Sequence, residues 1–144
     1  MKKFEDLSQT EKAALLKFPA YISLLAVNNS RLMDSAEKKE AIKLTHIKTF
    51  SSNPLLRQFY IDAEKVFEKN ITELDNDLPK DIDARKLAIN KALQKLESTL
   101  KTLGDEYTVI MIEGLKAYIK HISKAHNTVI ENFVFPFDIP GVTT

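Results

Sequence analysis

The feature that most constrains the fold is a ladder of apolar residues in the second half of the chain, which ends at a glycine. Its members are spaced mostly by three or four residues: Ile82, Ile89, Leu93, Leu96, Leu100 and Leu103. This spacing places the side chains on one stripe of an α-helix, and Gly104 is the residue type that often ends a helix in a left-handed conformation. A stripe of this length has to be buried, so the ladder predicts a helix that packs lengthwise against other helices.

Start and stop signals predict further helices on both sides of the ladder. With the ladder helix included, the expected helical ranges are 8–17, 19–27, 34–50, 54–75, 82–103 and 106–127. A chain of 144 residues is one domain by the usual measure of roughly 100–200 residues each. We therefore expect a single all-α domain over residues 1–144, a bundle of five or six helices with short connections.

The expected helix ends depend on caps and prolines. Ser8 and Glu11 have the spacing of a capping box, and Asn53 precedes a proline that suits the first helical position. Asp81 or Asp83 is expected to cap the ladder helix. Pro19 should interrupt the first helix and bias the residue before it, Phe18, away from the helical region.

Four further helices have predicted core sides. The helix over 34–50 should bury Leu44, Ile47 and Phe50. The helix over 19–27 should turn Tyr21, Leu24, Leu25 and Ala26 inward. The helix over 54–75 should bury Leu56, Phe59, Tyr60, Ala63, Val66, Phe67 and Leu74. The last helix should bury Ile112, Leu115, Ile119, Ile122 and Ala125.

Charge and composition exclude several classes of function. There are 21 basic and 20 acidic residues, and this balance argues against a general nucleic-acid binder. The chain has no cysteine, which excludes disulfides, thiolate zinc sites and a cysteine nucleophile. No apolar run approaches the ~20 residues of a membrane span, and the first residues do not resemble a signal peptide. We expect a soluble cytoplasmic protein that contacts neither nucleic acid nor membrane.

Histidine is the usual carrier of chemistry near neutral pH, and His126 falls on the buried stripe near the end of the last predicted helix. It is a candidate ligand-site residue, or else a boundary histidine that caps carbonyl groups at a helix C-terminus. No Glu-x-x-His pair is present, although carboxylate-bridged metal bundles need one on each of two helices. We therefore expect no catalytic residues, no bound metal and no cofactor.

Two rows of lysines lie at helical spacing: Lys38, Lys39, Lys43 and Lys48 in one helix, and Lys116, Lys120 and Lys124 in another. Nearby glutamates offset part of this charge. Both rows are interpreted as mostly solvated outer faces, and the alternative is a specific contact with an anion or RNA.

Residues 133–144 are too rich in proline for a helix and too apolar for a free tail. The segment from Phe133 to Gly141 places Phe135 and Phe137 around Pro136, and it predicts an irregular, extended arm. The three phenylalanines Phe133, Phe135 and Phe137 are the candidate partner-binding residues.

The stretch from Ala26 to Glu37 resembles the helix–turn–helix junction of the tellurite-resistance TerB-like family, a small bacterial all-helical fold. Ala26, Leu32 and Glu37 fit the family pattern, whereas Asn29 and Ser30 stand where the family has aspartate and glycine. The resemblance implies a stress-associated accessory protein rather than a defined enzyme. It also implies acidic residues that bind metal, a role that the missing aspartate puts in doubt here.

These observations favour a non-enzymatic helical protein that acts by binding a protein partner or by self-association. The alternative is a small-molecule or metal-binding helical domain with a site between helices near His126.

Deletion of residues 133–144 distinguishes two roles for the arm. If the arm covers its own bundle, the truncated protein should melt at a lower temperature with unchanged mass, because up to three buried phenylalanines are lost. If the arm clasps a second copy, a dimer should become a folded monomer. Light scattering and thermal melting measure both. Unchanged mass and stability would contradict both roles and leave the arm as a docking site for another protein.

Overall fold

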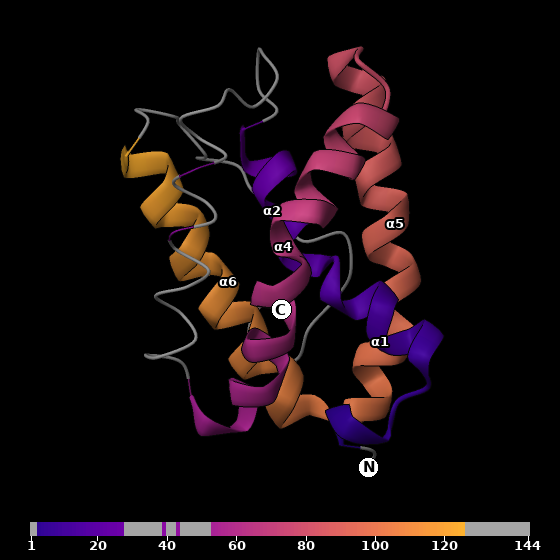
Figure 1. Cartoon of the computed structure of the whole chain (residues 1–144), viewed down its shortest axis with the longest axis vertical. Coiled ribbons are helices and arrows are strands. Elements are labelled where there is room, and N and C mark those ends of the chain that lie inside the picture. The colour runs from indigo at the N-terminus through magenta and orange to yellow at the C-terminus, as the bar shows by residue number, and fades with distance from the viewer. Residues whose placement is uncertain (1–2, 28–38, 40–42, 44–52, 126–144) are drawn as a thin grey trace.

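The computed structural model describes residues 3–27, 39, 43 and 53–125, and within these residues it is helical and contains no strand (Figure 1). Over the stretches 3–27 and 53–125, five α-helices are described: α1 (Gln9–Leu16), α2 (Phe18–Val27), α4 (Arg57–Asp77), α5 (Ile82–Leu103) and α6 (Asp105–Ala125). In the same residues, the 3-10 turn η1 (Phe4–Asp6) precedes α1, and the 3-10 turn η2 (Pro54–Leu56) precedes α4. The all-α prediction is confirmed. Of the helix expected over 34–50, only Lys39 and Lys43 are described, and both are helical.

The predicted caps are present where the sequence placed them. The Ser8 Oγ accepts from the Glu11 amide at 3.1 Å, and the Glu11 carboxylate accepts from the Ser8 amide at 3.1 Å. Asn53 Oδ1 accepts from the Leu55 amide at 2.9 Å, although the turn that follows is 3-10 and the α-helix begins only at Arg57. Between the two candidate caps of α5, the structure selects Asp81, which accepts from the Ala84 amide at 2.9 Å.

Two expected helix ends need correction. The second helix begins at Phe18, one residue earlier than predicted, because the break from α1 is a helical-type turn at Lys17 (φ −79°, ψ −12°). Pro19 then lies in the first turn, where an amide hydrogen has no partner within the helix. Gly104 has the expected positive φ of 93°, but its ψ of 163° lies outside the left-handed helical region. That combination is essentially restricted to glycine.

The helix α2 lies at the centre of the bundle, behind α4 and between α5 and α6 in Figure 1. It packs against α4, α6, α5 and α1. Its buried residues point in all directions: Phe18, Pro19, Ala20, Ile22, Ser23, Leu24 and Leu25. The predicted inward residue Tyr21 is only half-buried, since the buried surface is not one stripe but most of the helix circumference. The Ser23 hydroxyl donates to the Pro19 carbonyl at 2.7 Å, so its burial leaves no polar group unpaired.

The apolar ladder is the buried face of α5, as predicted. Ile89, Leu93, Leu96, Leu100 and Leu103 are all buried, and Ile82 is half-buried. The ladder has one long step, from Ile82 to Ile89, and the structure fills that step with Arg85, which is only 1% exposed. The stripe is therefore continuous, but one of its members is charged.

Arg85 links the first turns of α5 to the end of α4. Its Nη2 donates to the Asp75 carbonyl at 2.7 Å and to Asp75 Oδ1 at 3.1 Å, and its Nε donates to the Pro79 carbonyl at 3.0 Å. Lys80 Nζ also donates to the Asp75 carbonyl. Carbonyl groups at a helix C-terminus lack partners within the helix, so the guanidinium satisfies them and fixes the turn between the two helices.

The buried side of α4 was predicted in large part. Leu56, Phe59, Tyr60, Ala63 and Phe67 are buried, whereas Val66 and Leu74 are half-buried. The sequence reading missed Asn70, Ile71 and Asp75, which are also buried. Asn70 Nδ2 donates to the Leu16 carbonyl at 3.5 Å, so one of these polar residues meets the end of α1.

Replacement of Arg85 tests whether this contact fixes the turn. Arg85→Met keeps most of the side-chain volume but removes the charge that faces the buried Asp75 carboxylate. Breaking a buried ion pair from one side costs about 3–5 kcal/mol, and urea unfolding followed by circular dichroism should show a loss of that order.

Arg85→Lys is the matched control because it keeps the charge. It should recover only part of the loss, since a lysine lacks the planar fork that reaches Asp75 and Pro79 together. A loss below about 0.5 kcal/mol for Arg85→Met would contradict a structural role, because ordinary surface substitutions fall in that range.

Candidate functional site

The site residues predicted from the sequence lie outside the described residues. This holds for His126 and for the three phenylalanines Phe133, Phe135 and Phe137. The described part of the molecule instead contains two hollows, at different places on the bundle, that the sequence reading did not anticipate.

The first hollow, which we call the lysine groove, lies between α5 on one side and α1 with the start of α2 on the other. Its volume is about 590 Å³. It is lined by Thr10, Glu11, Ala14, Lys17, Tyr21, Ala88, Lys91, Ala92, Lys95, Leu96 and Thr99. The three alanines are short side chains on facing helices, and this explains why the surface is hollowed here.

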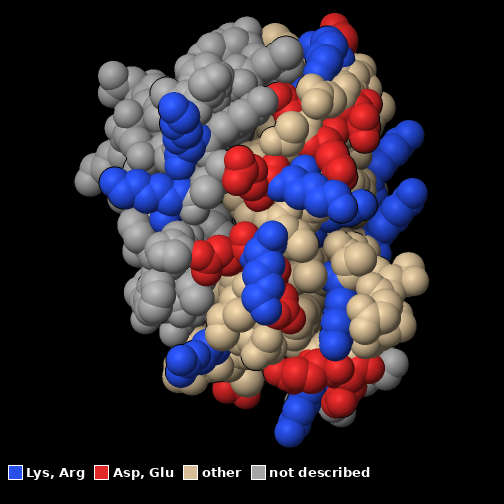
Figure 2. Space-filling model, in the orientation of Figure 1, with Lys and Arg blue, Asp and Glu red and all other residues tan. Residues whose placement is uncertain are grey.

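The lysine groove carries more positive than negative charge. Lys91 and Lys95 are exposed on α5, and Lys17 is half-buried on the opposite wall. None of the three forms an ion pair with a described residue. The single acidic residue of the lining, Glu11, is hydrogen-bonded in the capping box of α1. Figure 2 shows Lys and Arg side chains projecting along the edge of the molecule that α5 occupies in Figure 1.

A lysine that is engaged within its own helix provides the contrast. Lys101, further along α5, lies 3.2 Å from Glu97. Lys91 and Lys95 have no acidic residue four positions away on the helix, because those positions hold Leu87, Lys95, Lys91 and Thr99. Their positive charge is therefore available to a ligand.

The sequence reading missed this groove for a physical reason. The spacing of Ala88, Lys91, Ala92 and Lys95 places them on one side of the ladder helix, and this spacing could have predicted one wall of the groove. The facing wall comes from α1 and α2, about 70 residues earlier in the chain, and only the packing arrangement brings the two walls together. In the first of the two lysine rows that the sequence did single out, Lys39 and Lys43 are exposed, as expected.

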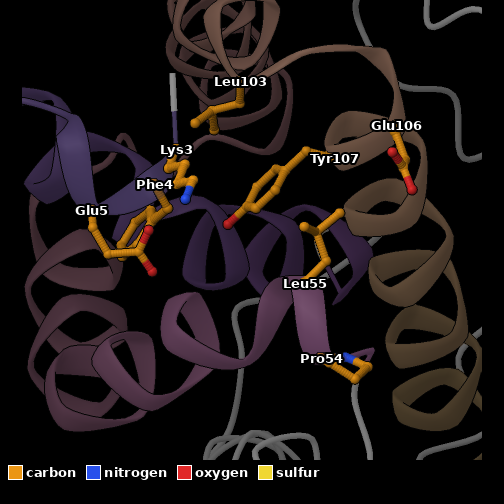
Figure 3. A pocket seen from close by; sticks show the side chains of 8 residues that line it. All are labelled: Lys3, Phe4, Glu5, Pro54, Leu55, Leu103, Glu106 and Tyr107. Carbon is orange, nitrogen blue, oxygen red and sulfur yellow. The ribbon is translucent and has the colours of Figure 1, made fainter. Parts of the chain in front are cut away.

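The second hollow, which we call the tyrosine pocket, lies at the end of the bundle where α5 meets α6 (Figure 3). Its volume is about 510 Å³, and η1, η2 and the α5–α6 junction contribute its walls. The lining residues are Lys3, Phe4, Glu5, Pro54, Leu55, Leu103, Glu106 and Tyr107. Phe4, Leu103 and Tyr107 are buried, whereas the charged residues are exposed at the rim.

The Tyr107 side chain reaches from the start of α6 into this pocket. In Figure 3 its ring extends toward Phe4 and Lys3, with the hydroxyl group leading. The residue is only 6% exposed. Neither its hydroxyl nor that of the buried Tyr60 has a hydrogen-bond partner among the described residues.

Burial raises the pKa of both hydroxyl groups well above the ordinary value for tyrosine. For Tyr107, the negative charge of Glu5 and the neighbourhood of Tyr60 raise the pKa further. Both phenols therefore stay protonated and neutral through the physiological range, so each can donate a hydrogen bond.

Within the described residues, no group of three or more His, Asp or Glu side chains is arranged to hold a metal ion. None of the helices in the same part of the chain is both long and apolar enough to span a membrane. Comparisons with protein-family models, curated proteins and solved structures gave no match. The resemblance of residues 26–37 to TerB-like proteins therefore stays a prediction, and residues 28–37 lie outside the described part.

Proposed function

We propose that this protein is a non-enzymatic helical interaction protein, and that the lysine groove receives an acidic amphipathic helix from a protein partner. The observation that supports this proposal is a lining of alanines between two facing walls that carry three lysines with no ion-pair partner among the described residues. Binding of an amphipathic helix in a groove between helices is a common mode of peptide recognition.

The shape of the groove favours a helical segment over a flat surface. Ala14, Ala88 and Ala92 have short side chains, so a partner backbone can approach closely between α1 and α5. The half-buried apolar part of Tyr21 and the buried Leu96 provide apolar contacts for the inner face of such a helix.

The charge of the groove favours acidic residues along the edges of the partner helix. Lys17 approaches from one wall, and Lys91 and Lys95 approach from the other. Carboxylates on both edges of a bound helix would meet these lysines without displacing an existing ion pair. The overall balance of 21 basic and 20 acidic residues argues against nucleic acid as the partner, because a nucleic-acid surface usually carries a larger positive excess.

The wider setting of this proposal rests on the sequence. We place the protein in the bacterial cytoplasm as an accessory protein, associated with stress as the TerB-like resemblance at residues 26–37 implies. Self-association is the second form of the same function, with the C-terminal arm around Phe133, Phe135 and Phe137 as its proposed contact.

Charge reversal in the groove provides the test. The double variant Lys91→Glu/Lys95→Glu should weaken binding of a fluorescently labelled, Glu-rich amphipathic helical peptide by about tenfold or more in low salt. Two attractions become repulsions, and exposed charge pairs contribute roughly 0.2–1 kcal/mol each, with 1.4 kcal/mol for each tenfold in affinity. Fluorescence anisotropy measures the change, which should shrink as salt is added.

The matched control is Lys65→Glu/Lys69→Glu on α4. These two lysines are also exposed and four residues apart, but they lie outside the groove. The control should bind the peptide within about twofold of the parent. Equal weakening by both double variants would show only a general charge effect and would contradict the proposal, as would tighter binding of single-stranded RNA than of the peptide.

A further inference from the structure

The tyrosine pocket carries an inference that is independent of the lysine groove. We propose that this pocket is a binding site for a neutral, mainly apolar small molecule that carries a hydrogen-bond acceptor such as a carbonyl oxygen. In this proposal the Tyr107 hydroxyl donates to that oxygen, and Phe4, Leu55 and Leu103 contact the apolar body.

The Tyr107 hydroxyl has no hydrogen-bond partner among the described residues. The other buried polar side chains of the described residues all have partners. Ser23 bonds to Pro19, Asn70 to Leu16, Asp75 to Arg85, and the Thr108 hydroxyl to the carbonyls of Leu100 and Gly104 at 3.0 and 2.9 Å. Only the hydroxyls of Tyr60 and Tyr107 lack one in that part of the chain. A buried donor without a partner destabilises the folded state, so a partner supplied from outside is the natural explanation.

Tyr107, unlike Tyr60, belongs to the lining of a hollow that a ligand can enter. Tyr60 lies behind the wall: its ring packs edge-on against Phe59 at 5.1 Å between centroids, and Phe59 packs edge-on against Phe4 at 5.8 Å. Leu55, which is 46% exposed, stands in the lining as an apolar residue open to solvent.

The charges around the pocket select the kind of ligand. Glu5 and Glu106 oppose an anionic group, and Lys3 opposes a cationic one. The Tyr107 hydroxyl is neutral at physiological pH, as for any tyrosine, and burial raises its pKa further, so it is a hydrogen-bond donor rather than a phenolate that would attract cations. The volume of about 510 Å³ lies within the usual range of small-molecule sites, about 300–1,000 Å³.

A buried water is the main rival explanation. Tyr60 is close enough to Tyr107 to influence its pKa, so one water could accept from both hydroxyls and satisfy them. That arrangement predicts no affinity for an organic ligand, and it predicts that the two tyrosines behave alike on substitution. The ligand proposal predicts that they differ in their effect on ligand affinity.

The test uses PRODAN, a neutral naphthalene ketone whose emission reports both apolar surroundings and hydrogen bonding at its carbonyl. The parent protein should bind PRODAN with a shift of its emission to the blue. Tyr107→Phe removes only the hydroxyl, and it should weaken binding by about threefold to tenfold, the range that corresponds to one neutral hydrogen bond. The same variant should melt at a higher temperature without ligand, because the unpaired donor is gone.

Tyr60→Phe is the matched control. It removes the other unpaired hydroxyl and should also raise the melting temperature, but PRODAN affinity should stay within about twofold of the parent. A second variant, Leu55→Arg, should block the pocket from an exposed position and abolish binding while the protein remains folded.

Three results would overturn the proposal. One is a parent protein that does not bind PRODAN. Another is equal affinity for the parent and Tyr107→Phe. The third is full binding by Leu55→Arg, which would place the probe elsewhere on the molecule. None of these outcomes bears on the peptide measurement at the lysine groove, so the two proposals fail separately.

Discussion

The burial of α2 is the constraint on which the rest of the structure depends. This helix, from Phe18 to Val27, contains one serine and one tyrosine among otherwise apolar residues and has no charged residue. A helix that is apolar on all sides has no face to present to water, so other helices have to surround it. In the structure α1, α4, α5 and α6 do so, and their own apolar stripes are the surfaces that meet α2 or each other around it.

This arrangement explains why polar groups in the interior matter so much. Helices that enclose a central helix bring their ends into the protein, and the end carbonyls then need partners. Arg85 donates to a carbonyl at the end of α4, and Asn70 donates to one at the end of α1. Thr108 donates to carbonyls at the end of α5. Each of these side chains is buried and hydrogen-bonded, and each joins two neighbouring segments at a particular position.

Periodicity and capping chemistry predicted the helical class, the caps at Ser8 and Asn53, a cap for α5 at Asp81 or Asp83, and most of the buried face of α5. These features depend on residues close together in the sequence, and therefore the sequence reveals them. Arg85 was missed because burial of an arginine can be predicted only when its hydrogen-bond acceptors are known. Its acceptors, Asp75 and the Pro79 carbonyl, come within reach only in the folded turn between α4 and α5. The dominant role of α2 was also missed. Its ten residues are fewer than the 22 of α5, and the longer stripe gave the stronger periodic signal.

Both hollows are places where this pattern of pairing is incomplete. Among the residues that the structure describes, the lysine groove has charges without ion-pair partners, and the tyrosine pocket has a donor without an acceptor. Neither could be predicted from one segment, since each is assembled from parts of the chain that are distant in sequence. The two sites are also separate from each other. The groove lies along the side of α5, whereas the pocket lies at the end where α5 passes into α6.

Native-state hydrogen exchange tests most directly whether α2 is the centre of the fold. Amides in the buried part of α2, such as those of Ile22, Leu24 and Leu25, should exchange only through global unfolding. Their exchange free energies should equal the free energy of unfolding from urea titration. Amides on the exposed side of α5, such as that of Lys91, should exchange at lower free energies. If the α2 amides instead open well below the global value while the α5 ladder stays protected, then α5 and not α2 organises the bundle, and this account of the fold is wrong.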